Sequence, residues 1–297
     1  MDSNGILYLV ATPIGNLEDI TLRALRVLKE VDLIGAEDTR NSRKLLNYFE
    51  INTPLTSYHD HNQKTKGRQL IDKLLGGINI ALISDAGMPG ISDPGSLLVK
   101  QALEAGITVV PVPGANAALA ALIASGINTD QFIFHGFLPR RKKEREERLL
   151  LLKEESRTVI IYEAPHRLLA TLKCLAKCWH GGQVAVAREL TKKFEEFVRG
   201  TSQEVLEHFL VTQPRGEITM VLEGNREISQ GSTREKQGLG LTQPKEENNP
   251  VEQVMGLVKQ GYQKKDAIKA VSNLLRINRR ILYQQVLEAE GKGKGKR

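Results

Sequence analysis

The chain has 297 residues, of which 40% are hydrophobic and 26% are charged, and its formal net charge is +7. These values predict a globular protein with a substantial core and room for two domains. Its longest apolar runs are far shorter than the roughly 20 residues of a membrane-spanning helix, so we expect no membrane association. The N-terminal residues carry no basic segment before their apolar stretch, so we expect them to lead into a first strand rather than to form a signal peptide.

Three apolar strands in the N-terminal part each lead into a loop rich in Pro, Gly and small polar residues. These segments are 6–19, 78–95 and 107–126. In open α/β sheets ligands bind just outside the carboxyl ends of the strands, so the three loops predict one shared site. Between the first two segments, Thr21 is expected to cap a helix and residues 41–50 are expected to form another.

Strands and helices continue to alternate beyond a boundary near residue 126. The pattern predicts an α/β fold with two lobes, residues 1–126 and 127–225, and a cleft between them. The strands expected in the second lobe are 132–139, 158–168, 183–191 and 217–224.

The two cysteines, Cys174 and Cys178, lie four residues apart on an expected helix of the second lobe. They have no Cys or His neighbours at metal-ligand spacing, so we expect packed thiols rather than a zinc site or a disulfide. This cysteine usage fits a reducing compartment, and we expect a cytoplasmic protein.

A different composition begins after the second lobe. Residues 226–249 contain few large apolar residues and many polar ones, which predicts a flexible linker. Three short helices are expected over residues 250–290, followed by a basic tail at 291–297. Pro250 would begin the first of these helices and Gly261 would end it.

The C-terminal segment accounts for the whole net charge of the chain. Residues 251–297 contain eleven Lys and Arg against four Asp and Glu, whereas the rest of the chain is balanced. Arg276, Arg279 and Arg280 lie at the turn between the last two helices, where Asn278 would cap the final helix. This arrangement resembles a helix-turn-helix and favours a nucleic-acid partner, although any small basic helical bundle would show the same periods.

A second basic cluster comprises Arg140, Arg141, Lys142 and Lys143 at the start of a charged helix. It is a further candidate for contact with RNA phosphates, while a solvated helix face is the alternative.

Eight motifs follow one another between residues 6 and 224. They are TPIGNLEDIT, AEDTR, SDAGMPGISDPG, PVPGANAALAALIASG, FHGFLPR, YEAPHR, ARELTKKFEE and GEITMVLEG. In their residues and their order, these motifs resemble those of the ribosomal RNA small subunit methyltransferase I family, which has the tetrapyrrole methylase fold. The resemblance implies two α/β lobes with the methyl-donor cleft between them. It also implies a homodimer that uses S-adenosylmethionine to methylate the ribose 2′-hydroxyl of a cytidine in the decoding region of 16S ribosomal RNA, in the small ribosomal subunit.

The loop after the first strand departs from the wider fold family. It contains a single glycine, Gly15, where tetrapyrrole methylases commonly carry a GxGxG-type loop. This difference matches the ribosomal RNA branch and argues against a tetrapyrrole precursor as substrate. Two alternatives remain open: a methyltransferase of such small molecules, and an RNA-binding protein without catalysis.

By resemblance, the donor site lies in the glycine- and proline-rich loops. Glycines permit close approach of the backbone to a ligand and prolines stiffen the turns, and the chain has no GxxxxGK[ST] phosphate loop. On their own, Asp85 and Asp93 would be interpreted as caps of turns or helices. The expected donor-binding residues are Pro13, Asp85, Ala86, Gly87, Met88, Pro89, Ser92, Asp93, Pro94, Pro113, Gly114, Ala115, Asn116, Tyr162, Thr219 and Met220.

Methyl transfer from a sulfonium needs no metal, but a ribose hydroxyl is a weak nucleophile. A general base or a polarising cation is therefore expected. Each candidate could equally belong to an ion pair that holds the cleft together. The candidates are Asp38, Glu163, Arg188, Glu189 and Lys192, with Glu37, Arg40 and His166 beside them in the same motifs.

His59 and His61 are separated by one aspartate, which is a weak metal signal. A polar loop facing RNA is the preferred interpretation, and no metal site is expected.

Overall fold

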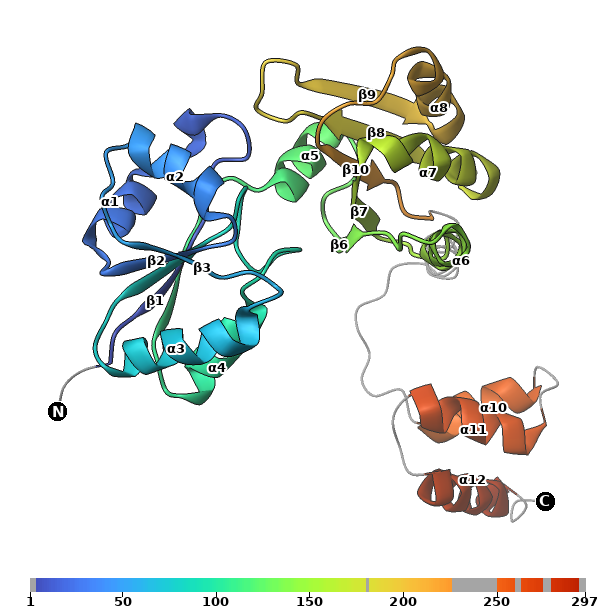
Figure 1. Cartoon of the computed structure of the whole chain (residues 1–297). Helices are drawn as coiled ribbons and strands as arrows, with labels where there is room; N and C mark the ends of the chain where they lie inside the picture. Colours follow the sequence, from blue (N-terminus) through green and yellow to red (C-terminus); the bar gives the residue numbers. More distant parts are fainter. Residues whose placement is uncertain (1–3, 180–181, 226–249, 260–262, 275–278, 294–297) are drawn as a thin grey trace. The chain divides into compact units, whose positions relative to one another are not determined.

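The computed structural model describes residues 4–179, 182–225, 250–259, 263–274 and 279–293 (Figure 1). The chain divides into two compact units, Met1–Arg234 and Glu235–Arg297. In the described part of the chain, no helix has the length and apolar character needed to cross a membrane.

The first lobe is built on a five-stranded parallel sheet of order β3-β2-β4-β1-β5. Its strands are β1 (Leu7–Val10), β2 (Leu33–Ala36), β3 (Leu55–Ser57), β4 (Ile80–Ile83) and β5 (Val109–Val112). A short 3₁₀ helix, η1 (Leu17–Asp19), follows β1. Because all the strands are parallel, their carboxyl ends and the loops that follow them lie along one edge.

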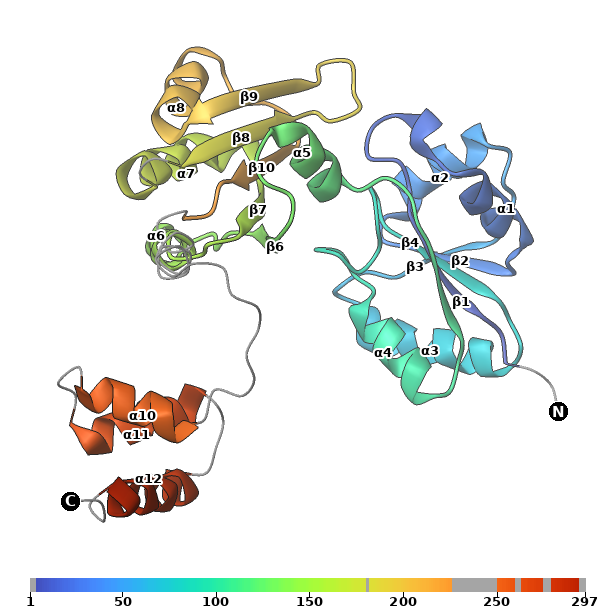
Figure 2. The same ribbon diagram turned by 180° about the vertical axis from the view of Figure 1, so that it is seen from behind.

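Helices cover both faces of this sheet. Helices α1 (Leu22–Glu30) and α2 (Thr39–Tyr48) bury apolar residues against one face, and α3 (Gln63–Leu75) and α4 (Ser96–Glu104) against the other (Figures 1 and 2). Thr21 caps α1 as predicted, with its side chain accepting from the backbone N–H of Ala24.

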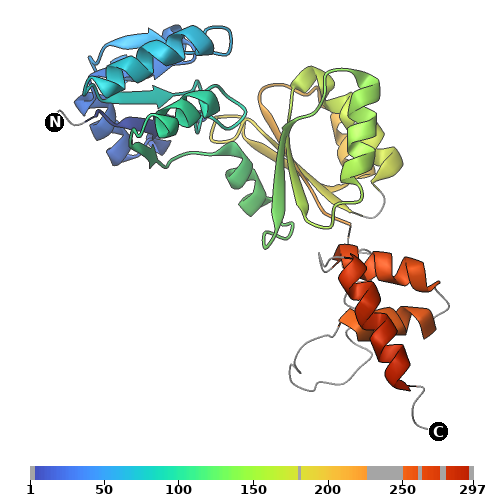
Figure 3. The same ribbon diagram turned by 90° about the horizontal axis from the view of Figure 1, so that it is seen from below.

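The second lobe contains a mixed sheet of order β6-β7-β10-β8-β9. Strands β6 and β7 are parallel and the other neighbours are antiparallel. The strands are β6 (Phe132–Phe137), β7 (Thr158–Glu163), β8 (Gln183–Arg188), β9 (Glu196–Thr201) and β10 (Ile218–Leu222). Helix α5 (Ala117–Ser125) starts directly after the loop that follows β5 and packs on one face of this second sheet (Figure 3).

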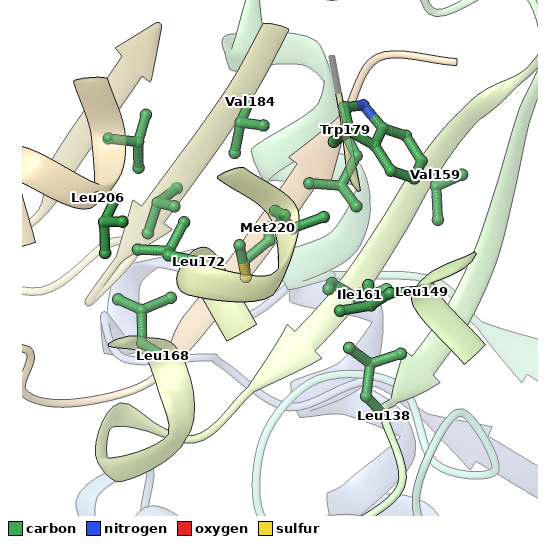
Figure 4. Packing of buried hydrophobic residues seen from close by; sticks show 14 of the residues in the cluster. Leu138, Leu149, Val159, Ile161, Leu168, Leu172, Trp179, Val184, Leu206 and Met220 are labelled. Carbon is green, nitrogen blue, oxygen red and sulfur yellow. The ribbon is translucent and has the colours of Figure 1, made fainter. Parts of the chain in front are cut away.

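The other face of the second sheet carries the largest core cluster. Helices α6 (Lys142–Leu152), α7 (Pro165–Cys178) and α8 (Ser202–Val211) pack there, and Leu172 and Met220 lie in its middle (Figure 4). Cys178 is buried and Cys174 is half-buried on α7, and both are free thiols.

The second unit contains α10 (Pro250–Lys259), α11 (Lys264–Leu274) and α12 (Arg279–Gly293). Its core includes Val254, Ala267, Ile268, Val271, Leu282 and Val286. The predicted linker 226–249 and the predicted signals at Gly261, Arg276 and Asn278 lie outside the described residues. The domain limits drawn from the sequence stay predictions.

Several local predictions need correction. The strand expected over 158–168 ends at Glu163, because Pro165 has no N–H for a sheet and instead occupies the first turn of α7. Strand β9 and helix α8 were not predicted. Helix α8 nevertheless begins with a capping box formed by Thr201 and Glu204, a pattern that is visible in the sequence.

Core packing in the second lobe can be tested at Leu172, which is fully buried. Leu172→Ala should lower the free energy of unfolding by about 2–5 kcal/mol, because it leaves a cavity under the sheet. Leu151→Ala on α6 is the control, since that side chain is 68% exposed, and should cost less than about 0.5 kcal/mol. Urea unfolding followed by the fluorescence of Trp179, the chain's one tryptophan, measures both. Equal losses would contradict this packing.

Candidate active site

Two loops at the edge of the first sheet are joined by backbone hydrogen bonds. The N–H of Thr12, after β1, donates to the carbonyl of Gly87, after β4 (2.9 Å), and the N–H of Gly87 donates back to the carbonyl of Thr12 (3.1 Å). Gly87 has a φ of +82°, and a Cβ there would lie 3.3 Å from the Ile14 side chain. Glycine is therefore the residue that fits.

A carboxylate in the β4 loop connects this loop to α2. Asp85 accepts hydrogen bonds from the backbone N–H of Asp38 (3.1 Å) and from the side-chain amide of Asn41 (3.0 Å). Asp38 caps α2 and binds the Arg40 guanidinium, whose hydrogen bond lowers the pKa of Asp38 to about 2. A carboxyl of such low pKa is a poor proton acceptor near neutral pH. The contacts of Asp38 and Asp85 are those of residues that hold the site together.

A cavity of about 360 Å³, which we call the first cavity, lies between the loops of the first lobe and the second sheet. The ring of Phe137 packs against the ring of Tyr162 on its second-lobe side, with centroids 5.5 Å apart. One side of the cavity is thus an aromatic wall from the second lobe, and the loop after β4 lines it from the first lobe. Its lining comprises Ile14, residues 86–88, 91–93 and 116–117, Phe137, and residues 162–165 and 216–219.

Asp93 is one of the carboxyl groups that line the first cavity, beside Glu163 and Glu217. Burial, together with the nearby Glu37 carboxylate, raises the pKa of Asp93 to about 6. Burial and the Asp85 charge also raise the pKa of Glu37. A cation entering the cavity would favour the charged form of Asp93.

A second and more open hollow, of about 350 Å³, adjoins the first cavity. We call it the α2 hollow, because side chains of α2 form one wall. Ile14, Ala86 and Glu217 line both spaces, so the two share a wall. The α2 hollow is lined by residues 12–15, Leu17, Asn41, Lys44, Leu45, Tyr48, residues 85–86, Lys192 and Glu217.

Lys192 lines the α2 hollow and contacts Glu217 of the shared wall. Its ammonium donates to the carboxylates of Glu189 (2.9 Å) and Glu217 (3.1 Å), and Glu189 also accepts from the backbone N–H of Glu217 (2.9 Å). Partial burial opposes the charge on Lys192, but the two carboxylates raise its pKa. The ammonium therefore stays protonated beside Glu217, whose side chain is 70% exposed.

Glu163 is 2% exposed, and hydrogen bonds and an ion pair hold its carboxylate in place. It accepts from the Thr171 hydroxyl (2.6 Å) and from the N–H of Ala164 (2.9 Å), and its carboxylate lies 3.1 Å from the Arg167 guanidinium. Arg167 also donates to the carbonyl of Leu138. This cluster fixes the end of β7 against α7, so the Glu163 carboxylate already has partners.

The remaining polar candidates lie apart from the two spaces. Arg188 donates to Glu196 (2.9 Å) and lines neither of them, and His166 is exposed at the start of α7. The rings of His59 and His61 lie 6.0 Å apart. No group of three or more His, Cys, Asp and Glu placed to hold a metal ion occurs among the residues described.

The basic cluster at 140–143 continues into α6, where most of its charges are paired. Arg141 contacts Glu144 at 3.1 Å, and Lys142 and Lys143 lie 4.0 Å from the glutamates one turn further on. Contact of this cluster with RNA stays a prediction.

The residues predicted to bind the donor fall into three groups. The first cavity is lined by Ala86, Gly87, Met88, Ser92, Asp93, Asn116, Tyr162 and Thr219. Pro13 and Asp85 line the α2 hollow, whereas Pro89, Pro94, Pro113, Gly114 and Ala115 line neither. The Met220 side chain lies in the core on the far face of the sheet (Figure 4), so only its backbone is available to a ligand.

Sequence reasoning missed several lining residues. Glu217 is the second residue of the motif GEITMVLEG, and Tyr48, Lys44 and Asn41 lie outside the glycine- and proline-rich loops. A signal for the last three existed, because their spacing along α2 puts them on one helix face.

Comparison with known proteins decides the family. The family of Tetrapyrrole (Corrin/Porphyrin) Methylases matches residues 6–206. The ribosomal RNA small subunit methyltransferase I of Halalkalibacterium halodurans is 48% identical, over 95% of this chain and 94% of its own length. The protein of the same name from Bacillus subtilis is 53% identical, over 76% of this chain and 78% of its own. The chain belongs to the ribosomal RNA small subunit methyltransferase I family of tetrapyrrole methylases.

Solved structures share the fold of this methyltransferase at low sequence identity. The uroporphyrin-III C-methyltransferase of Thermus thermophilus, complexed with S-adenyl homocysteine, is 20% identical with a TM-score of 0.53, and the match covers 74% of this chain and 97% of that chain. Diphthine synthase is 11% identical with a TM-score of 0.57, over 74% and 90%. The predicted two-lobed α/β fold and the predicted family are both confirmed.

The charge of Asp93 in the methyltransferase gives a testable pH dependence. Folding raises the pKa of Asp93 from 3.8 to about 6, so the folded state holds more protons than the unfolded state between these values. Stability should therefore fall as the pH rises through this window, and the cost is fully present above it. Asp93→Asn should raise the free energy of unfolding by about 1–2 kcal/mol at pH 8 and leave it nearly unchanged at pH 4.

Urea unfolding of both proteins at the two pH values measures this difference. Asp72→Asn, at an exposed position on α3, is the control for a general loss of negative charge. The same stabilisation at both pH values would show that the Asp93 charge is not the cause.

Proposed function

We propose that this methyltransferase transfers a methyl group from S-adenosylmethionine to the ribose 2′-hydroxyl of a cytidine in the decoding region of 16S ribosomal RNA. The observation that carries the proposal is the wall shared by the first cavity and the more open α2 hollow: Glu217 belongs to that wall, and Lys192 contacts Glu217 from the α2 hollow. A small donor and a large acceptor need such neighbouring spaces, because the reacting atoms must be brought together in register. The names of relatives at 48% and 53% identity support the RNA substrate.

The first cavity fits the cofactor in size and chemistry. About 360 Å³ is within the usual range for a small-molecule site. Phe137 and Tyr162 offer a surface for the adenine, and Asp93 offers a negative charge for the cationic groups. The start of α5, at Asn116 and Ala117, would place the positive end of a helix dipole at the cofactor's carboxylate.

The close approach of two backbone loops also favours binding of the cofactor in the first cavity. A Cβ at Gly114 would lie only 2.8 Å from the Cβ of Ala11, so the loop after β5 reaches the loop after β1 only with glycine there. Once bound, the cofactor supplies a methyl group activated by a sulfonium.

The chain's own part in the reaction is to hold the acceptor hydroxyl and take its proton. Lys192 stays protonated, so we assign it to donate a hydrogen bond to the hydroxyl oxygen, where negative charge develops. Glu217 is the carboxylate that lines both spaces and is more exposed than Glu189. We therefore assign the proton to the Glu217 carboxylate.

The partners follow from the same proposal. The substrate is the RNA of the small ribosomal subunit, and the enzyme acts in the cytoplasm as a homodimer. The unit formed by α10, α11 and α12 contacts RNA phosphates, which is supported by the eleven Lys and Arg against four Asp and Glu in residues 251–297.

The proposed function is tested by labelled methyl transfer onto small ribosomal subunits from a strain that lacks this enzyme. We expect label on a single cytidine ribose, mapped by nuclease digestion and mass spectrometry. Label on a tetrapyrrole precursor instead, with none on the subunit, would establish the small-molecule alternative. Failure to bind S-adenosylmethionine in calorimetry would support the non-catalytic alternative.

Lys192→Met should lower kcat by about 10²–10³, because it removes the cation beside the acceptor oxygen. The Kd for S-adenosylhomocysteine should stay at the wild-type value. Lys193→Met is the matched control: the neighbouring ammonium is exposed, lies over the Phe194 ring and lines neither space, so kcat should not change. A merely structural role for Lys192 would lower the thermal stability and weaken the binding of S-adenosylhomocysteine together with kcat.

A further inference from the structure

One face of α2 is directed into the α2 hollow. Asn41, Lys44, Leu45 and Tyr48 all line it, and their spacing of three, four and seven residues is that of a single helix face. Ser42 and Leu46, on the opposite face of the same helix, are buried against the sheet. The residues of the outward face are therefore not there to pack the core of the first lobe.

The side chains of this face are open to a ligand. The Tyr48 side chain is 65% exposed, and its ring is braced at its edge by Phe49, with centroids 4.9 Å apart. Lys44 is exposed and makes no ion pair within the part of the chain that the structure describes. By contrast, Arg40 on the same helix is paired with Asp38 at 2.7 Å.

The position of the hollow limits what it can hold. It shares Ile14, Ala86 and Glu217 with the first cavity, so its occupant touches the wall at which the methyl group is transferred. An exposed aromatic ring stacks on an unpaired base, and an unpaired lysine binds a phosphate. The same hollow is lined by Lys192 and Glu217, the pair to which the acceptor hydroxyl was assigned.

We propose that the α2 hollow is the acceptor-nucleotide site, in which one unstacked nucleotide of single-stranded RNA stacks its base on Tyr48 and places a backbone phosphate against Lys44. Its ribose then faces Lys192 and Glu217. This inference rests on the proposed function, and it adds the residues that select a single-stranded target. A base inside a helical stack cannot reach Tyr48, so the target nucleotide is turned out of its stack.

The experiment uses the full chain, labelled methyl transfer and small subunits lacking the modification. Tyr48→Ala should raise KM for subunits at least about tenfold, and Tyr48→Phe, which keeps the ring, should restore it. The Kd of each variant for S-adenosylhomocysteine should equal that of the wild type, because Tyr48 does not line the first cavity.

Lys44→Gln gives an independent readout in binding rather than turnover. The slope of log Kd for subunits against log salt should become shallower by about 0.7–0.9, the share of one phosphate contact. Lys73→Gln, at an exposed position on α3, is the matched control and should leave the slope unchanged.

Three results would overturn the proposal while leaving the proposed function intact. In the first, Tyr48→Ala methylates subunits with the wild-type KM, and Lys44→Gln binds subunits with the wild-type dependence of log Kd on log salt. Another is a parallel loss of S-adenosylhomocysteine binding, which would make the hollow part of the donor site. The third is a change in molar mass of Tyr48→Ala in light scattering, which would make the α2 face a contact between copies of this chain. Absence of ribose label with the wild-type enzyme would instead overturn the proposed function itself.

Discussion

Two backbone hydrogen bonds between Thr12 and Gly87 set the geometry on which both spaces depend. They pair two loops that leave neighbouring strands, and the residues beside the pair are Ile14 and Ala86. These two residues are also part of the wall shared by the first cavity and the α2 hollow. The partition between donor and acceptor is therefore held by main-chain hydrogen bonds, which position it more firmly than flexible side chains would.

The second lobe reaches this partition through the loop between β8 and β9. Glu189 and Thr191 have φ values of +52° and +65° there, and such backbone conformations persist only where the surroundings hold them. Hydrogen bonds provide the restraint: the N–H of Glu189 donates to the carbonyl of Glu217, the N–H of Thr191 donates to the Glu195 carboxylate, and Lys192 binds Glu189 and Glu217. The Lys192 side chain runs against Gly15, where a Cβ would collide with it. The single glycine that the loop after β1 retains thus has a packing reason beyond its role in turning the chain.

The sequence was sufficient for the lobes and for the loops that meet at the sheet edge, because strand-end loops and hydrophobic periodicity are local properties. It was insufficient for the roles of individual polar residues, because these depend on the contacts that each side chain makes in the folded chain. Asp38, Glu163 and Arg188 are candidate catalytic residues by their place in the motifs, and in the fold each has a hydrogen-bond partner; their catalytic roles stay predictions. For Tyr48 the sequence carries no such motif, because its context is that of an ordinary helix. Only the folded chain places it with Lys192 in the lining of one hollow.

A run of basic residues in the sequence need not offer free positive charge in the folded protein, because neighbouring carboxylates can pair with it. The cations at the start of α6 stand beside glutamates one turn away, so much of their field is cancelled and exposed pairs of this kind contribute little. Lys44 has no such neighbour and lies in a concave surface, where a single charge acts on a ligand at short range. The two spaces also differ in their charged groups: Asp93, Glu163 and Glu217 line the first cavity, whereas Lys44 and Lys192 join the carboxylates of Asp85 and Glu217 in the α2 hollow. Carboxylates therefore face a cationic donor in the first cavity, and among the described lining residues the ammonium groups that an RNA phosphate could contact occur only on the other side of the partition.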